Sequence, residues 1–203
     1  MTNVLSIKSS IFSGQGQSSQ LTERFIQSLT AGAAEINVVE RDLALNPVPH
    51  LDGQTVSAFM ADSNASLNEQ QKQGLELSNT LIDELKSADV LLLGVPMYNF
   101  GIPSTLKAWI DHVARAGITF RYTENGPEGL VSNIKKAYIL AARGGVYQGT
   151  AQDSQTQYMK DVLAFLGINE VEFIYAEALN MGQQETAIAD AHQKIEKEVS
   201  EIV

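Results

Sequence analysis

Three segments of this chain combine hydroxyl, amide, glycine and aromatic side chains in patterns that suit a bound ligand, and each follows an apolar run. The first, residues 9–20, is rich in serine, glutamine and glycine and leads into a helical pattern. Backbone N–H groups and hydroxyls at a helix N-terminus bind phosphate, and the helix dipole strengthens the attraction. The segment therefore predicts a phosphate site, although an ordinary capped loop has a similar composition.

The second and third segments could hold a flat heteroaromatic ring. Residues 96–105 read Pro-Met-Tyr-Asn-Phe-Gly-Ile-Pro-Ser-Thr, and residues 142–145 read Ala-Arg-Gly-Gly. Such a ring needs apolar contact on its faces and hydrogen bonds around its edge, and glycines let the main chain approach it closely. The alternatives are a strand end with buried aromatic residues for the second segment and a surface charge for Arg143.

The first segment also begins like a dinucleotide fingerprint, because Gly14-Gln-Gly16 opens a G-x-G-x-x-G pattern. However, Ser19 stands at the third glycine position, and Gly14 lies several residues beyond the expected strand end. A longer, hydroxyl-rich loop suits a terminal phosphate monoester, which presents more oxygens than a bridging pyrophosphate. FMN is therefore favoured over tightly bound NAD or FAD.

Composition excludes several other chemistries. The absence of cysteine rules out thiolate metal sites, disulfides and a cysteine nucleophile, and the three histidines have no metal-ligand spacing, so we expect no metal site. A net charge of −10 disfavours nucleic acid and anionic lipid. The N-terminus shows no secretion signal, and no apolar run approaches the roughly 20 residues that cross a bilayer. We expect a cytoplasmic protein without membrane contact.

The elements that position the three segments follow from hydrophobic patterning. Continuous apolar runs at 4–7, 90–95 and 137–142, with weaker ones at 35–39 and 171–175, are typical of parallel strands covered on both faces. Helical patterns lie between them, and Ser18 or Ser19 is expected to cap the first helix. The alternation predicts an α/β fold, a flavodoxin-like three-layer sandwich with a five-stranded parallel sheet of order 2-1-3-4-5, as one domain over residues 1–203. Ligands of such sheets bind beyond the carboxyl ends of the strands, where all three segments would meet.

Two insertions exceed this plan. Residues 44–66 are polar and contain proline, and residues 117–131 read as a hairpin-like lid because Asn125-Gly126 is a strong turn signal. Long loops in a compact α/β domain are often functional.

Taken together, these motifs closely resemble those of bacterial FMN-dependent NADH azoreductases, also described as quinone reductases, over nearly the whole chain. The resemblance rests on Lys8-Ser-Ser10, Gln17-Ser18, Pro96-Met-Tyr-Asn-Phe100, Ala114-Arg-Ala-Gly117, residues 119–129 and Arg143-Gly-Gly145. It implies that the FMN phosphate is bound by Ser10, Gly16, Gln17 and Ser18. It further implies that the isoalloxazine ring is held by Met97, Tyr98, Asn99, Phe100, Ala142, Arg143, Gly144 and Gly145, and that the substrate pocket contains Phe100, Tyr122, Phe165 and Met60. The alternative for Phe165 is a core residue of the helix that ends before Gly167.

The chain departs from the family pattern at four positions. Gly16 and Ala142 stand where relatives often have serine, Met60 where some have arginine, and Tyr147 where some have histidine. These positions bear on the phosphate contacts, the choice between NADH and NADPH, and the range of acceptors.

The function implied by the resemblance is an FMN-dependent NAD(P)H oxidoreductase that reduces quinones and azo compounds by two-electron ping-pong hydride transfer. The donor is NADH or NADPH, and no catalytic side chain is expected because the flavin carries the chemistry. The alternative is a flavodoxin-type electron carrier that passes electrons to protein partners, which the acidity would suit and an aromatic lid would not. A hydrolase on the same fold lacks a convincing nucleophile with a nearby base.

Residues 109–122 suggest an interface. They carry Trp109, Ile110, Val113, Ile118, Phe120 and Tyr122, more large apolar groups than one helix and an exposed lid can bury alone. We expect a homodimer whose two FMN sites use residues from both subunits, as the resemblance also implies. The alternative is that Phe120 and Tyr122 fold back on their own subunit.

Overall fold

Five parallel strands form the central sheet of the computed structural model, which describes residues 1–32, 35–62 and 64–202. Their order is β2-β1-β3-β6-β7, which is the predicted order 2-1-3-4-5 counted over the parallel strands. The strands are β1 (Thr2–Lys8), β2 (Ile36–Asp42), β3 (Val90–Pro96), β6 (Lys136–Ala142) and β7 (Val171–Ala176). Every residue of the central strand β3 is buried, which explains its uninterrupted apolar sequence.

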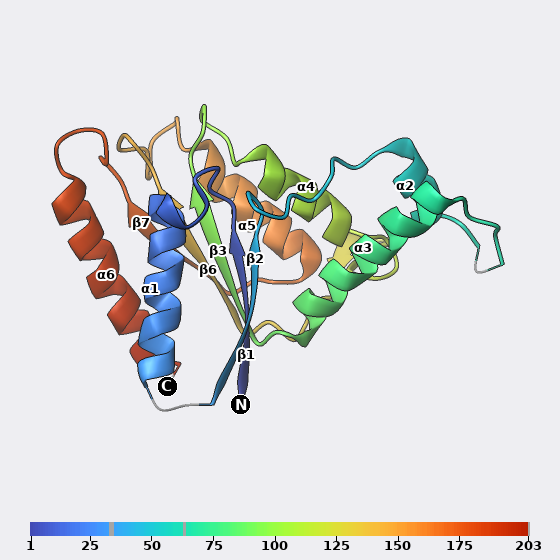
Figure 1. Ribbon diagram of the computed structural model, residues 1–203, viewed down its shortest axis with the longest axis horizontal. Helices are drawn as coiled ribbons and strands as arrows, with labels where there is room; N and C mark the ends of the chain where they lie inside the picture. Colours follow the sequence, from blue (N-terminus) through green and yellow to red (C-terminus); the bar gives the residue numbers. More distant parts are fainter. Residues whose placement is uncertain (33–34, 63, 203) are drawn as a thin grey trace.

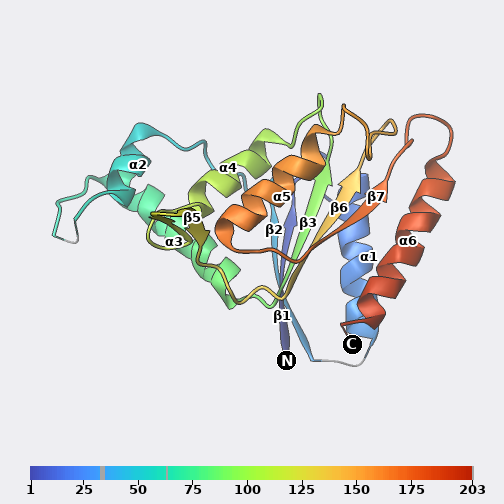
Figure 2. The ribbon, with the colours of Figure 1, turned by 180° about the vertical axis from the view of Figure 1, so that it is seen from behind.

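Helices cover both faces of this sheet, as Figures 1 and 2 show. One face carries α1 (Gln17–Ala31) and α6 (Gln184–Ser200), while the other carries α3 (Glu69–Ser87), α4 (Ser104–Val113) and α5 (Ser154–Leu166). The α1 side of the core includes Phe25 and Tyr138, whose ring centroids lie 4.7 Å apart. The flavodoxin-like three-layer sandwich is therefore confirmed. None of the helices in the described ranges is long and apolar enough to span a membrane.

A glycine on the central strand brings α1 close to the sheet. A Cβ at Gly94 would lie 2.8 Å from Thr22 Oγ1 and 3.1 Å from the Ser18 carbonyl oxygen, both on α1. Only glycine permits this approach without a shift of the helix. As a result, the N-terminal turn of α1 lies beside the carboxyl end of β3.

The start of α1 differs from the sequence-based expectation. The helix is preceded by a 3-10 turn, Ser13–Gln15, and its N-cap is Gly16, which has no side chain to form a cap hydrogen bond. The prediction that Ser18 or Ser19 caps the helix is therefore wrong. Both serines lie inside the first turn and are buried.

The first insertion contains a short helix, α2 (Gly53–Phe59), which the sequence did not lead us to expect. Its N-cap Asp52 accepts a hydrogen bond of 2.8 Å from the Thr55 N–H. A Cβ at Gly74 would lie 2.6 Å from Thr55 Oγ1, so the glycine allows α2 to pack on α3. Together α2 and the first half of α3 project from the body of the molecule (Figure 1).

The second insertion is the predicted hairpin. Strands β4 (Phe120–Thr123) and β5 (Gly126–Gly129) are antiparallel. The hairpin docks on the C-terminal end of α5, where a Cβ at Gly129 would lie 2.0 Å from the backbone nitrogen of Gly167. Gly167 itself has a φ of 103°, a conformation that favours glycine.

Candidate cofactor site

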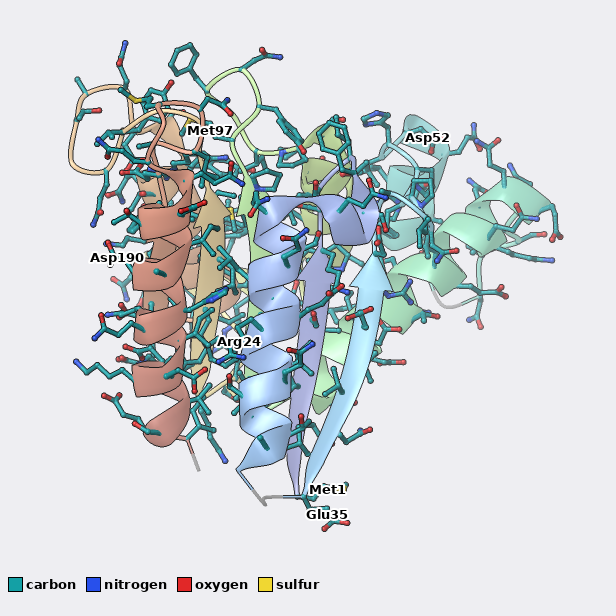
Figure 3. The ribbon with its side chains drawn as sticks, turned by 60° about the vertical axis from the view of Figure 1, so that its left-hand side comes forward. Met1, Arg24, Glu35, Asp52, Met97 and Asp190 are labelled. Carbon is teal, nitrogen blue, oxygen red and sulfur yellow. The ribbon has the colours of Figure 1, made fainter. Side chains whose placement is uncertain are left out.

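A cavity of about 380 Å³ lies beyond the carboxyl ends of the central strands. Met97, which lines it, stands at the upper edge of the sheet in Figure 3. Residues from all three predicted segments line it: Ser10, Gly16, Gln17, Met97, Tyr98, Ala142, Arg143 and Gly144. The placement follows from topology, because the carboxyl ends of parallel strands meet at one edge.

The first end of the cavity is the N-terminus of α1. The amide of Gln20 donates to the Gly16 carbonyl at 3.0 Å, which opens the helical ladder and leaves the N–H groups of residues 17–19 without helical acceptors. Within the described part of the chain, the buried hydroxyls of Ser18 and Ser19 have no hydrogen-bond partner. A buried donor without a partner costs free energy of folding. Such donors at a helix N-terminus are suited to bind a phosphate group.

Ser10 fills the space beside Gly16 that another side chain would need. A Cβ at Gly16 would lie 2.0 Å from Ser10 Oγ. Ser10 Oγ accepts from the Phe12 N–H at 3.2 Å and shares a hydrogen bond of 3.2 Å with the Tyr98 hydroxyl. The phosphate-binding candidate segment is thereby joined to the segment after β3.

That second segment forms a tight turn with an unusual backbone. Tyr98 and Gly101 exchange two backbone hydrogen bonds of 3.0 and 2.9 Å. Between them, Asn99 and Phe100 have φ values of 50° and 64°, in the left-handed region that non-glycine residues rarely adopt. The turn presents Phe100, 53% exposed, with its ring edge-on to Tyr147 at 5.7 Å between centroids.

The turn also borders a second, more apolar cavity of about 480 Å³. Its walls include Phe100, Ile102 and Tyr158, with His50 and Lys107 at its polar margin. Phe100 thus stands between the candidate cofactor cavity and an open apolar surface that could receive a flat molecule.

Arg143 in the third segment is not a surface charge, because it is only 1% exposed. Its guanidinium pairs with Asp153 at 2.9 Å and Glu177 at 3.1 Å, and it lies 4.9 Å from the centre of the Tyr175 ring. Burial works to raise the pKa of Asp153, but hydrogen bonds from Thr156 and Arg143 outweigh it, so the pKa is lowered. Burial raises the pKa of the Tyr175 hydroxyl. The side chain of Arg143 is therefore a structural anchor.

The backbone around Arg143 offers donors to the cavity. The carbonyl oxygens of residues 143, 144 and 145 accept from the N–H groups of Leu179, Asn180 and Ala178, respectively. Across the described residues, the N–H groups of Gly144 and Gly145 have no acceptor. They are suited to the carbonyl oxygens at the edge of a heteroaromatic ring.

Five further cavity residues were missed by the sequence-based prediction: Phe12, Pro96, Leu179, Asn180 and Gln184. The last three follow β7, whose carboxyl end lies at the same edge as the others. Applying the strand-end rule to β7 would have found them. Asn180 packs closely, since a Cβ at Gly144 would lie 2.5 Å from its Nδ2.

Residues 2–199 match the family model for the flavodoxin-like fold. The chain belongs to the flavodoxin-like fold family. This flavodoxin-like protein is 52% identical over 195 residues to an FMN-dependent NADH:quinone oxidoreductase of Alcanivorax borkumensis, covering 95% of this chain and 98% of the relative. A protein of the same name from Cellvibrio japonicus is 49% identical over 200 residues, with 98% and 100% coverage.

A solved structure of similar shape is the azoreductase from Bacillus anthracis strain Sterne, with a TM-score of 0.90 at 28% identity. The match covers 99% of the flavodoxin-like chain and 100% of the azoreductase. The first insertion and the hairpin are therefore included in a match that extends over almost the complete chain.

Four of the predicted cofactor residues lie outside the cavity lining of this flavodoxin-like protein. Ser18 is buried in the first turn of α1, and Asn99 and Phe100 form the tip of the turn after β3. Gly145 packs against Tyr147, whose ring would lie 2.9 Å from a Cβ at that glycine.

Three of the predicted substrate-pocket residues lie well away from the cavity lining. Met60 follows α2 on the projecting arm and is 81% exposed. Tyr122 lies on the hairpin and is 75% exposed, while the Phe165 ring packs on the Phe120 ring with centroids 4.2 Å apart. The hairpin does not cover the cavity of its own chain, because these contacts hold it at the opposite end of α5 from the strand-end edge (Figure 2).

The apolar residues of 109–122 also differ from the expectation of an exposed patch. Trp109, Ile110, Val113 and Phe120 are buried within the chain. Their number reflects a helix packed on the sheet, a turn and a docked strand, each of which contributes to the same core. Only Tyr122 of this set remains largely exposed.

Proposed function

We propose that this protein is an FMN-dependent NADH:quinone oxidoreductase that also reduces azo compounds. The observation that carries the proposal is the pair of unpaired buried hydroxyls, Ser18 and Ser19, at a helix N-terminus beside a strand-end cavity. The names of the relatives from Alcanivorax and Cellvibrio support the same activity. Bound FMN supplies a ring that accepts a hydride from NADH and passes two electrons to the acceptor.

The protein's own residues bind and orient. The N–H groups of residues 17–19, with the hydroxyls of Ser10 and Ser18, would hold the phosphate. Met97 and Tyr98 of the cavity lining, with Phe100 on the turn beside them, would give the ring apolar contact. The N–H groups of Gly144, in the lining, and of Gly145, next to it, would bind its polar edge. No side chain is required as a general acid or base.

NADH and the acceptor use one place beside Phe100 in turn. The exposed ring of Phe100 and the apolar cavity next to it offer a single flat surface for both molecules. Because the first product must leave before the acceptor binds, the kinetics are ping-pong. Many flat quinones and azo compounds fit such a surface, because little hydrogen bonding selects among them.

The active form is a homodimer in which the partner subunit's Tyr122 covers the surface beside Phe100. Two observations support this arrangement. Tyr122 is exposed on a hairpin that is remote from its own cavity, and the apolar cavity at Phe100 is open. A two-fold interface that joins these surfaces would complete both sites at once. We further propose a cytoplasmic location without nucleic-acid or membrane partners, supported by the acidic, cysteine-free composition.

Absorbance and steady-state kinetics test the function. The purified protein is expected to carry FMN and to oxidise NADH with benzoquinone as the only acceptor, giving parallel lines in double-reciprocal plots. Absence of flavin after reconstitution with excess FMN would refute the proposal. NADH oxidation that requires an added carrier protein would favour the flavodoxin-type electron carrier instead.

Light scattering and dilution test the dimer. We expect a mass twice that of the 22.1 kDa chain, with activity that falls on dilution as the subunits separate. A monomer with full activity at nanomolar concentration would exclude shared sites while leaving the redox function intact.

A further inference from the structure

The first turn of α5 lies between the two segments proposed to contact the ring. Its N-cap Asp153 accepts from the Thr156 N–H at 3.0 Å, which fixes the start of the helix. On one side the turn meets Arg143, and on the other it meets residues 96–101. It is therefore placed to set the spacing between these two segments.

One side chain in this turn touches both segments. Gln155 is 2% exposed, and its Nε2 donates to the carbonyl oxygens of Pro96 and Gly101, each at 2.9 Å. Its Oε1 accepts from Arg143 Nε at 3.3 Å. A primary amide has two N–H donors and an acceptor oxygen, and here each type is used.

The bonds of Gln155 close the segment that contains the left-handed residues. Pro96 and Gly101 stand at either end of it, and the hydroxyl of Ser154 donates to the Phe100 carbonyl inside it. Left-handed conformations at Asn99 and Phe100 cost free energy and persist where the surroundings fix them. The start of α5 provides that fixation at the ends and at the tip.

The same turn holds Arg143 through further groups. Arg143 donates to Asp153 at 2.9 Å and to Thr156 Oγ1 at 3.1 Å, besides its bond to Gln155. A shift of the Arg143 side chain would therefore also shift the backbone of residues 143–145. A change at Gln155 would therefore be felt on both sides of the cavity, although Gln155 does not line it.

We propose that Gln155 is a positioning residue that sets the distance between the turn at 96–101 and the backbone at 143–145, and so the width of the flavin-ring site. This inference rests on the proposed function and adds a determinant of it. Gln155 acts through the two segments and not by contact with the ring or the acceptor.

Gln155→Glu is the sharpest test, because the two side chains have nearly the same size. The carboxylate cannot donate, so the carbonyl oxygens of Pro96 and Gly101 lose their bonds from Gln155 and face a negative group, while Gly101 keeps its bond from the Tyr98 N–H. We expect release of FMN from the full-length holoprotein on dilution, followed by flavin fluorescence, to give a dissociation constant about 10- to 100-fold above wild type, from two lost hydrogen bonds. The visible circular dichroism of the remaining bound flavin should also change.

Gln157→Glu is the matched control, since Gln157 lies on the same helix, is exposed and, among the described residues, its side chain bonds to Asp161 and to neither ring segment. Gln155→Met, which is uncharged and of similar volume, tests the same loss if the buried carboxylate prevents folding. It should change FMN release and the flavin spectrum in the same direction but less.

The outcomes distinguish a failure of the Gln155 proposal from a failure of the proposed function. Wild-type FMN release and an unchanged flavin spectrum in whichever Gln155 variant folds would overturn the proposal, even if its free energy of unfolding fell. Selective loss of FMN with an unchanged Gln157→Glu control would support it. A wild-type chain that binds no FMN would instead refute the proposed function.

Discussion

Ser10 and Gly16 approach each other so closely that a Cβ at Gly16 would lie 2.0 Å from Ser10 Oγ and 2.5 Å from Ser10 Cβ. Because Ser10 also shares a hydrogen bond with the Tyr98 hydroxyl, any side chain at position 16 must move a contact between the phosphate and ring ends of the cavity. The close approach of Ser10 therefore leaves no room for a side chain at position 16 in the present arrangement.

Gly16→Ala should consequently weaken FMN binding by about tenfold, since Ser10 must shift and its bond to Tyr98 is lost. The dissociation constant from dilution of the holoprotein measures the effect. Gly14→Ala is the matched control, because the nearest contact of a Cβ there is Glu23 Oε1 at 3.4 Å. Equal affinities for the two variants would contradict the steric argument.

Ser18→Ala should stabilise the apoprotein against unfolding and weaken its affinity for FMN. The Ser18 hydroxyl is buried without a partner among the described residues, so its removal should raise the free energy of unfolding of the apoprotein by up to about 1 kcal/mol. The same change removes a proposed phosphate contact and should weaken FMN binding several-fold. Denaturation with and without FMN measures both effects.

Ser28→Ala provides the control for Ser18→Ala on the same helix. The Ser28 hydroxyl already donates to Glu196 at 2.8 Å and lies far along α1 from the cavity. It should leave FMN affinity unchanged. A Ser18 variant that lowers apoprotein stability and keeps FMN affinity would show that the hydroxyl has a structural partner instead.

Acid should weaken the ion pair between Arg143 and Asp153. The pKa of Asp153 is lowered in the folded protein, so its stabilising contribution is complete above the ordinary aspartate value of about 3.9 and is lost as pH falls through the lower folded value. Asp153→Asn keeps a good N-cap residue and removes the charge. Its free energy of unfolding should be roughly 2 kcal/mol below wild type at pH 6, and the difference should shrink toward pH 3. A difference that stays constant with pH would contradict the ion pair's role.

The sequence predicted the sheet because its inner strands β1, β3 and β6 are short, largely apolar runs, which can be recognised from local composition. It did not predict α2, whose polar sequence forms a helix through packing on α3 at Gly74. It placed the three cavity segments correctly at one edge. It could not determine whether Arg143 was exposed, because its partners Asp153 and Glu177 come from other elements.

The docking position of the hairpin could not be predicted from the sequence either. The pair Asn125-Gly126 is a local turn signal, and the hairpin itself is confirmed, with Glu124 and Asn125 as its loop residues and Gly126 as the first residue of β5. Where it docks depends on the approach of Gly129 to Gly167 and of Phe120 to Phe165, contacts between residues far apart in the chain. The sequence around Gly129 or Gly167 does not indicate that the two glycines contact each other.

Gly129→Ala should therefore displace the hairpin. A Cβ there would lie 2.0 Å from the Gly167 backbone nitrogen, and backbone cannot move aside as a flexible side chain can. We expect the free energy of unfolding to fall by more than about 2 kcal/mol in urea denaturation. In Gly53→Ala the added Cβ meets nothing within 4 Å, so its free energy of unfolding should lie within about 0.5 kcal/mol of the wild-type value. Similar stability of both variants would contradict the close docking.

Tyr122→Ala tests whether the hairpin serves the partner subunit. Tyr122 is 75% exposed, so its truncation should hardly change the free energy of unfolding. If the partner subunit's Tyr122 covers the surface beside Phe100, the KM for benzoquinone should rise about tenfold, as expected for the loss of about 1.4 kcal/mol of aromatic contact. Arg121→Ala is the control on the same strand, because within the described part of the chain it removes an exposed ion pair with Glu128 on the same hairpin. An unchanged KM in Tyr122→Ala, in a protein that scatters light as a dimer, would show that the hairpin contributes nothing to the neighbouring site.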